Sequence, residues 1–253
     1  MKKFIKISLL SVVVIAVLSG FLIYNGYIWL NTPGKSEFPV RGIDVSNHRG
    51  VIKWNKVKAQ GFDFAFIKAT EGMDYVDKYF EDNWEMATEA EIKKGAYHFF
   101  TFGSSGIDQA KNFIDIVPKE KGTLPPVIDI EFGGNSKNVP GKEALLKELN
   151  DFISEMEKHY ACKPILYVTY ESYDKYLMGE FEDLDIWIRD IIKYPGLKDE
   201  RQWLFWQYSN RGRVEGIEGF VDLNVFNGNM AEFEEHMTKA VMSSIRTWPA
   251  SVP

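Results

Sequence analysis

The stretch PPVIDIEFGG, residues 125–134, indicates the fold class of this 253-residue chain. Two prolines precede a run of β-branched residues typical of a buried strand, and two glycines follow it. Because side chains alternate along a strand, Asp129 and Glu131 are expected to point to the same side. A buried strand that ends in two carboxylates predicts a functional site at its carboxyl end, since unpaired charge is seldom buried without a role.

Seven further β-rich runs surround this strand, and amphipathic stretches with helical spacing separate the first six. We expect strands at 41–45, 64–69, 94–100, 126–131, 164–169, 185–189, 203–208 and 221–226. We expect helices at 52–60, 79–92, 105–116, 141–159, 171–178 and 230–246. Five strand–helix units followed by three strands predict a parallel-type α/β barrel that lacks its last helices. Active sites of such barrels lie at the carboxyl ends of the strands.

The first 30 residues differ in composition from the rest. Three lysines precede an uncharged stretch at residues 7–30, which is long enough to span a bilayer as a helix. The charge asymmetry predicts a cytoplasmic N-terminus and an extracytoplasmic domain. The segment 1–30 is thus expected to be a signal-anchor, or a signal peptide cleaved near Val17-Leu18-Ser19. The retained anchor is favoured because the apolar run continues past that site.

The remaining boundaries follow from composition. Residues 31–39 read as a short linker, residues 40–237 as a single barrel domain, and residues 238–253 as a helix end and tail. The chain carries a net charge of −6, or −9 without the three N-terminal lysines, which argues against a nucleic-acid partner. Its single cysteine, Cys162, allows no internal disulfide and no zinc–thiolate site. Nothing in the sequence requires more than a monomer.

Other strand ends carry polar or aromatic residues that could join the two carboxylates. Asp44 lies near the end of the first strand and Asp222 near the start of the last, although either could instead satisfy backbone amides. His48 and His98 lack a second histidine at ligand spacing and read as structural. Glu71 could be structural or line the cleft.

Paired carboxylates in a barrel mouth suit the hydrolysis of glycosidic bonds. One acid must give a proton to the leaving oxygen, while the other stabilises positive charge at the sugar or orients a group that does. Their proximity and apolar neighbours raise the pKa of one of them, which keeps a proton available near neutral pH.

Six motifs in order resemble glycoside hydrolase family 25, the Chalaropsis-type lysozymes. They cover about Val40 to Phe233 and are Arg41–Ser46 (RGIDVS), Phe66–Gly72 (FIKATEG), Gly95–Phe99 (GAYHF), Val127–Glu131 (VIDIE), Trp206–Tyr208 (WQY) and Val221–Phe226 (VDLNVF).

The resemblance implies a modified TIM-like (β/α)5(β)3 barrel. It also implies an N-acetylmuramidase that cleaves the β-1,4 bond between N-acetylmuramic acid and N-acetylglucosamine in peptidoglycan. It makes Glu131 the acid and Asp129 the second catalytic carboxylate, with no cofactor or metal. Positions matching those expected to bind the sugar are Asp44, Asp222, Tyr97, Tyr167 and Trp206.

Two places depart from the usual family pattern. Arg49 stands before Gly50 where the family usually carries Gln, and Arg189-Asp190 follows Trp187-Ile188 where the family usually reads Ala-Arg-Tyr. These departures bear on substrate preference at the edge of the cleft.

Three alternatives stay open at this point. A chitinase-like hydrolase also uses an Asp-x-Glu strand, but its longer acidic run is replaced here by Val127-Ile128. A non-catalytic glycan-binding domain could keep the barrel without the chemistry. A metal-dependent deacetylase could use Asp44, Asp129 and a histidine.

Overall fold

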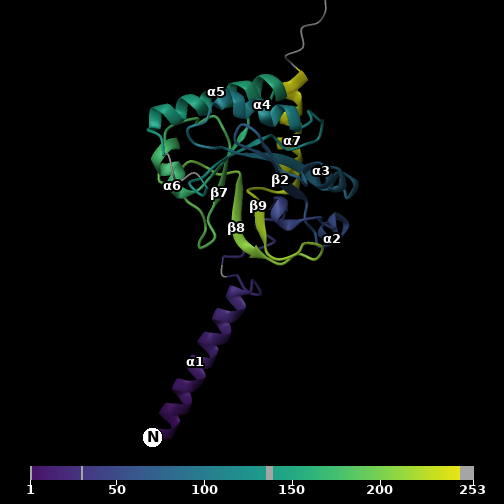
Figure 1. Ribbon diagram of the computed structural model, residues 1–253. Helices are drawn as coiled ribbons and strands as arrows, with labels where there is room; N and C mark the ends of the chain where they lie inside the picture. The colour runs from purple at the N-terminus through teal and green to yellow at the C-terminus, as the bar shows by residue number, and fades with distance from the viewer. Residues whose placement is uncertain (1, 30, 135–138, 246–253) are drawn as a thin grey trace, which may run out of the picture.

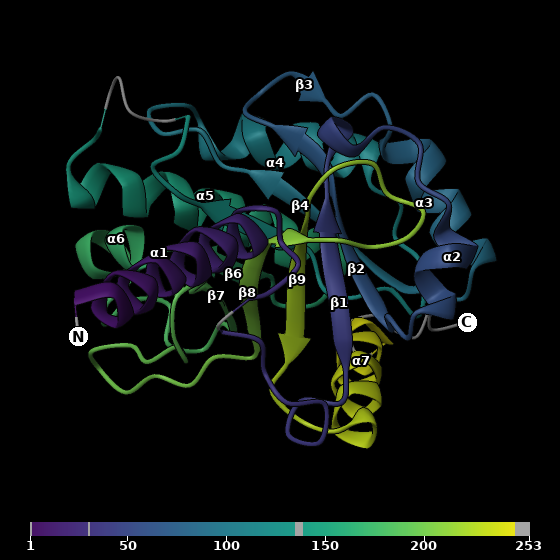
Figure 2. The same cartoon turned by 90° about the horizontal axis from the view of Figure 1, so that it is seen from below.

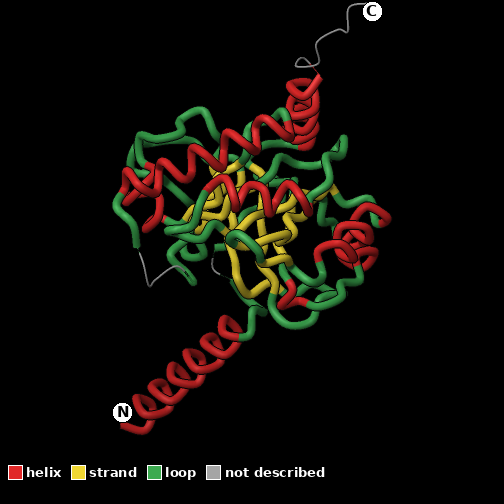
Figure 3. Tube along the Cα trace, turned by 45° about the horizontal axis from the view of Figure 1, so that its top comes forward, coloured by secondary structure: helices red, strands yellow, loops and turns green. Residues whose placement is uncertain are grey.

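The computed structural model describes residues 2–29, 31–134 and 139–245. One closed sheet forms the centre of the molecule, and helices cover its outside (Figures 1 and 3). The strands are β1 (Arg41–Val45), β2 (Phe64–Glu71), β3 (Tyr75–Val76), β4 (Lys93–Phe99), β5 (Val127–Ile130), β6 (Ile165–Val168), β7 (Ile186–Arg189), β8 (Phe205–Gly212) and β9 (Val221–Phe226).

Helices follow the strands at the predicted places. They are α2 (Trp54–Ala59), α3 (Phe80–Glu89), α4 (Gly106–Ile116), α5 (Lys142–Tyr160), α6 (Tyr170–Ser172) with a π-helical turn at Tyr173–Leu177, and α7 (Met230–Ile245). The eight predicted strands and the predicted helices are thus confirmed within three residues, except that β8 continues four residues past its predicted end, to Gly212. The two-residue β3 was not predicted, and residues 246–253 of the predicted helix end and tail lie outside the described residues.

The last strand closes the barrel in the opposite direction to the others. Strands β1, β2, β4, β5, β6, β7 and β8 pair in parallel, whereas β9 is antiparallel to both β8 and β1 (Figure 2). Only residues 213–220 connect β8 to β9, and a parallel connection needs a dozen or more residues. The short connection therefore explains the antiparallel closure.

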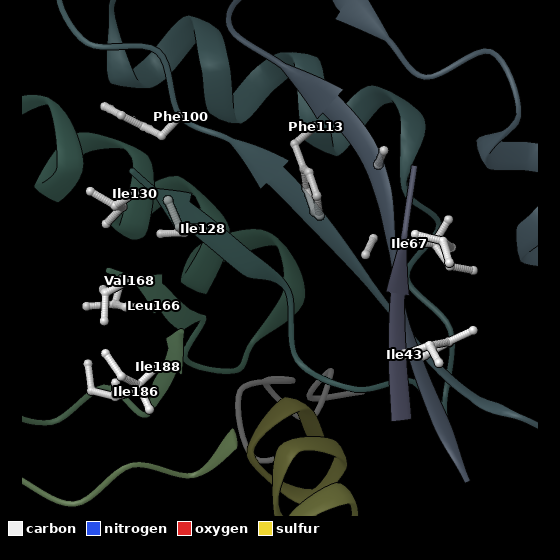
Figure 4. Close-up of a cluster of buried hydrophobic side chains, with 14 of the residues drawn as sticks. Ile43, Ile67, Phe100, Phe113, Ile128, Ile130, Leu166, Val168, Ile186 and Ile188 are labelled. Carbon is white, nitrogen blue, oxygen red and sulfur yellow. The ribbon is translucent and has the colours of Figure 1, made fainter. Parts of the chain in front are cut away.

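Alternation along the strands creates two separate cores. Ile43, Ile67, Ile128, Leu166 and Ile186 face outward under the helices (Figure 4). The residues between them face the barrel interior, where Phe64, Phe66, Val127, Ile165, Phe205 and Phe226 pack together. The outer core holds the helices on the barrel, while the inner core fills its amino end.

Large rings fill the amino end of the interior. Phe64 lies 5.1 Å from Phe205 and 5.6 Å from Phe233, measured between ring centroids. Gly42 is required beside them, because a Cβ at this position would lie 2.3 Å from the Phe64 ring. The interior at this end is therefore a packed core, as in other barrels of this type.

Trp29 and residues 31–40, which include the short linker predicted at 31–39, pack on the barrel. Trp29 Nε1 donates to the Tyr208 carbonyl at 2.7 Å, and Asn31 Nδ2 donates to the Asp190 carbonyl at 2.9 Å. Phe38 is only 3% exposed and lies against Trp203 and Trp206. These contacts tie the segment that precedes β1 to the barrel.

The N-terminal helix α1 (Lys2–Tyr24) projects away from the barrel (Figure 1). Its side chains from Leu10 to Phe21 are exposed. Within the described part of the chain, no helix is both long and apolar enough to cross a membrane. The membrane span predicted at residues 7–30 stays a prediction from the sequence.

Candidate active site

A polar cleft of about 520 Å³ opens at the carboxyl ends of the strands. Each strand except β2 and β3 contributes to it directly or through the residues that follow. The lining residues are Asp44, Arg49, Tyr97, Asp129, Glu131, Tyr167, Trp187, Arg189, Gln207, Asn210 and Asp222. The cleft thus unites four of the predicted acids with two of the predicted tyrosines.

Asp129 and Glu131 lie together at the end of β5, as their spacing predicts. Asp129 is 8% exposed, and its Oδ1 has no hydrogen-bond partner among the described residues. Burial raises the pKa of Asp129 well above its usual range, and the nearby Glu131 raises it further. Burial also raises the pKa of Glu131, an increase that the Arg189 guanidinium opposes. The pair therefore retains a proton at a pH where an exposed pair would have lost it.

Amide side chains hold Asp44 in place on the opposite wall. Its Oδ2 accepts hydrogen bonds from Gln207 Nε2 at 2.9 Å and from Asn224 Nδ2 at 2.8 Å. Burial raises the pKa of Asp44 to about 6, although both hydrogen bonds act in the opposite direction. Trp187 Nε1 in turn donates to Asn224 Oδ1 at 2.9 Å, and Tyr167 Oη donates to Gln207 Oε1 at 3.0 Å. This network fixes the orientation of both amides, so that their NH2 groups face Asp44.

Asp222 stands directly opposite Asp44 in the register of β9 and β1. Burial and the neighbouring Asp44 raise the pKa of Asp222 to about 8, while Arg49 and Arg189 act against the rise. Each of the four acids in the cleft thus has a raised pKa.

Two predicted residues lie elsewhere. Trp206 faces outward, is 2% exposed and donates from Nε1 to the Asp190 carbonyl at 2.8 Å. This position corrects the prediction that Trp206 lines the cleft, because the alternation along β8 turns Gln207 inward instead. Glu71 is not among the lining residues and forms an ion pair with Lys68 at 2.7 Å.

Several cleft residues were not selected from the sequence. Trp187 and Arg189 lie in β7 and Gln207 lies in β8. The sequence alone does not show which of the two alternating sets of side chains on each strand points inward. Alternation measured from Asp129 across the paired strands would have selected Trp187, since β5, β6 and β7 place Asp129, Tyr167 and Trp187 in one row.

His98 lies outside the cleft in the outer core. Its Nδ1 contacts Thr70 Oγ1 at 2.7 Å and its Nε2 contacts Gln109 Oε1 at 3.2 Å. Burial lowers the pKa of His98 to about 3, which keeps the ring neutral. His98 is therefore structural, as predicted, and cannot join Asp44 and Asp129 in a metal-dependent deacetylase site.

A smaller cavity of about 210 Å³ lies elsewhere, lined by Trp84, Pro118 and Cys162 among others. The Cys162 thiol is part-buried, and burial raises its pKa to about 11. A protonated thiol is a weak nucleophile, so we assign no chemistry to this cavity.

Comparisons with known proteins agree with this geometry. The sequence model of glycosyl hydrolases family 25 matches residues 43–217. A family 25 glycosyl hydrolase from Bacillus anthracis is 46% identical, with a TM-score of 0.77 and coverage of 81% of this chain and 97% of that chain. A lysozyme from Streptomyces coelicolor is 33% identical, with a TM-score of 0.72 and coverage of 79% and 98%. Lysozyme M1 of Streptomyces globisporus is 36% identical over 204 residues, which are 76% of this chain and 69% of that protein. The chain belongs to glycosyl hydrolases family 25.

Proposed function

We propose that the protein is a peptidoglycan hydrolase that cleaves the β-1,4 bond between N-acetylmuramic acid and N-acetylglucosamine, with Glu131 as the general acid. The observation that carries this proposal is the pair Asp129 and Glu131 in one cleft, with a raised pKa for both. The lysozymes among the relatives support the choice of substrate.

In the proposed reaction, Glu131 gives its proton to the glycosidic oxygen as the bond to the anomeric carbon breaks. Water then supplies a hydroxyl group to that carbon and returns a proton to Glu131. Glu131 is suited to this role because burial raises its pKa. The proton is thus held until the leaving oxygen needs it.

Asp129 has two possible roles in this reaction. Its carboxylate could stabilise positive charge at the anomeric carbon, or it could accept a hydrogen bond from the sugar's 2-acetamido N–H and orient that group for attack. The free Oδ1 of Asp129 provides an acceptor for either role. Asp44 and Asp222, on the opposite wall, would contact sugar hydroxyls together with Tyr97 and Tyr167.

We also propose that the protein acts outside the cytoplasm, as a monomer held at the membrane by residues 7–30. The lysines that precede this uncharged stretch, and the exposed apolar side chains from Leu10 to Phe21, support the proposal. Fractionation of cells that express the full chain tests it. Retention with the membrane at full length is expected, whereas recovery of a shortened protein from the medium would replace the anchor with a cleaved signal peptide.

Identification of the new reducing ends in digested peptidoglycan tests the reaction. The digest is reduced with borohydride and analysed by mass spectrometry, with Glu131→Gln as the control. Reduced muramic acid ends that depend on Glu131 are expected. Reduced glucosamine ends would change the bond cleaved and favour the chitinase-like alternative. Binding to glycan without new ends would favour a non-catalytic glycan-binding domain.

A further inference from the structure

Two arginines stand among the acids of the cleft. Arg49 follows β1, and Arg189 ends β7, where it pairs in register with Gln207. The Arg49 guanidinium reaches the connection between β8 and β9, because a Cβ at Gly219 would lie 3.5 Å from Arg49 Nη1. Arg189 opposes the rise in the pKa of Glu131, Asp44 and Asp222, whereas Arg49 does so for Asp44 and Asp222. The two cations therefore stand at different places along one cleft.

Neither guanidinium has a side-chain hydrogen bond or an ion pair with any residue that the structure describes. This contrasts with the four other arginines of the described barrel residues, Arg41, Arg201, Arg211 and Arg213, each of which donates to a backbone carbonyl. Both cleft arginines are half-buried. A guanidinium offers five donors in a planar fork that fits a carboxylate with two parallel hydrogen bonds.

The nearby acids leave these donors available. Asp44 accepts its two hydrogen bonds from Gln207 and Asn224 rather than from an arginine. Burial and Asp44 raise the pKa of Asp222 to about 8, so near neutral pH it is largely protonated and does not neutralise Arg49. An anionic group that enters the cleft thus meets cationic donors without having to displace an existing partner.

Resting on the function proposed above, we propose that Arg49 and Arg189 are specificity-determining residues that bind a carboxylate of the substrate next to the scissile bond. Two parts of peptidoglycan can supply this carboxylate. One is the lactyl group of muramic acid when it carries no peptide, and the other is an acidic residue of the attached stem peptide. The shared chemistry is a carboxylate on the muramic acid side of the bond, which neutral glycans lack.

Binding to the non-cleaving variant Glu131→Gln tests this proposal without interference from turnover. The probes are a muramic-acid-containing tetrasaccharide with free lactyl carboxylates, its methyl ester, and the same sugar bearing stem peptides. Calorimetry gives Kd for each probe with Arg49→Gln and Arg189→Gln added singly and together. Lys111→Gln, an exposed charge on α4, is the matched control for the loss of one positive charge.

The parent variant is expected to bind a carboxylate-bearing probe about 10- to 100-fold more tightly than the ester, as for hydrogen bonds to charged groups. The double arginine substitution is expected to abolish that preference and leave ester binding unchanged, whereas Lys111→Gln preserves it. If the arginine substitutions weaken binding of the free lactyl probe only, the lactyl group supplies the carboxylate. If they weaken binding of the peptide-bearing probe only, the stem peptide supplies it.

An unchanged preference in the arginine variants, equal weakening for all probes, or no binding of any probe would overturn the proposal. Turnover of peptidoglycan by the wild-type protein separates this failure from failure of the proposed function. Cleavage at muramic acid without an arginine-dependent preference would overturn only the role of Arg49 and Arg189.

Discussion

The two ends of the barrel interior are built from the same strands but differ in chemistry. At the amino end the strands contribute Phe64, Phe205 and Phe226, which pack into an apolar plug. Towards the carboxyl end, the inward-facing side chains become polar. Gln207 lies two residues after Phe205 on β8, and Asn224 lies two residues before Phe226 on the antiparallel β9, next to the acids of the cleft. Strands β5, β8 and β9 thus change from apolar to polar within about 7 Å, the length of two residues.

The amino end of the barrel interior therefore serves mainly the stability of the fold, and the carboxyl end serves the chemistry. The apolar plug is buried and satisfied by packing alone, whereas the cleft holds acids with raised pKa values, which are a cost to the folded state near neutral pH. Substitutions at the amino end should therefore affect folding, and substitutions at the carboxyl end should affect turnover. The following variants test that division, in order of decreasing expected effect.

Asp129→Asn should lower kcat on peptidoglycan by about 100-fold or more, because it removes a charge or an acceptor needed in the transition state. Its free energy of unfolding should stay the same or rise, since a buried carboxyl with a raised pKa is replaced by a neutral group. Kinetics and urea unfolding of the purified variant measure both quantities. A large loss of stability with little loss of turnover would show that Asp129 holds the fold instead.

Phe64→Ala should lower the free energy of unfolding by about 3–5 kcal/mol, because it removes a fully buried ring from the plug. Urea unfolding measures the loss, and KM of the folded fraction should stay within about twofold. If the alanine variant does not fold, Phe64→Leu should cost about 1 kcal/mol with the same KM. A change in KM without a loss of stability would contradict the division between the two ends.

Trp206→Phe should cost about 1–2 kcal/mol of stability by removing the hydrogen bond to the Asp190 carbonyl. Its KM should not change, because the ring faces the outer core. Tyr167→Phe is the matched comparison on the inner face, where loss of the hydrogen bond to Gln207 should change the kinetics. A raised KM for Trp206→Phe with normal stability would contradict the outer-core position of Trp206 and indicate that it binds substrate.

Asp222→Asn should change how stability depends on pH. The pKa of Asp222 is raised from 3.8 to about 8 in the folded protein, so its contribution is present below about pH 4 and is lost as the pH rises towards 8. The variant lacks this loss. Its free energy of unfolding should therefore exceed that of the wild type by about 1 kcal/mol or more at pH 9 but not at pH 4. Thermal or urea unfolding at both pH values measures the difference, with the exposed Asp115→Asn as the control. Parallel pH profiles for Asp222→Asn and the wild type would contradict the raised pKa.

Much of the fold follows from local patterns in the sequence. The strand ending in Asp129 and Glu131 was predicted with its acids on one side, because a period of two is a local property. The antiparallel direction of β9 was not predicted, since it depends on the length of the connection and on closure with β1. Trp206 was expected to bind the sugar because of the family resemblance, and the sequence does not reveal that Gln207, rather than Trp206, faces inward on β8.

The interior contacts of the cleft depend on distant parts of the chain. The amides that hold Asp44 come from β8 and β9, 163 and 180 residues further along. Arg49 and Arg189 departed from the family pattern in the sequence, but only the structure places both in the same cleft. The packing of Trp29, Asn31 and Phe38 likewise depends on rings and carbonyls that lie far away in sequence.

The most direct test of the account measures turnover and stability of Glu131→Gln together. We expect kcat on peptidoglycan to fall by about 100- to 10,000-fold, as for loss of a general acid, with an unfolding free energy at least equal to that of the wild type. This result would place the proton donor at the carboxyl end of β5. Turnover within a few-fold of the wild type, in a variant that folds normally, would contradict the assignment of Glu131 as the acid.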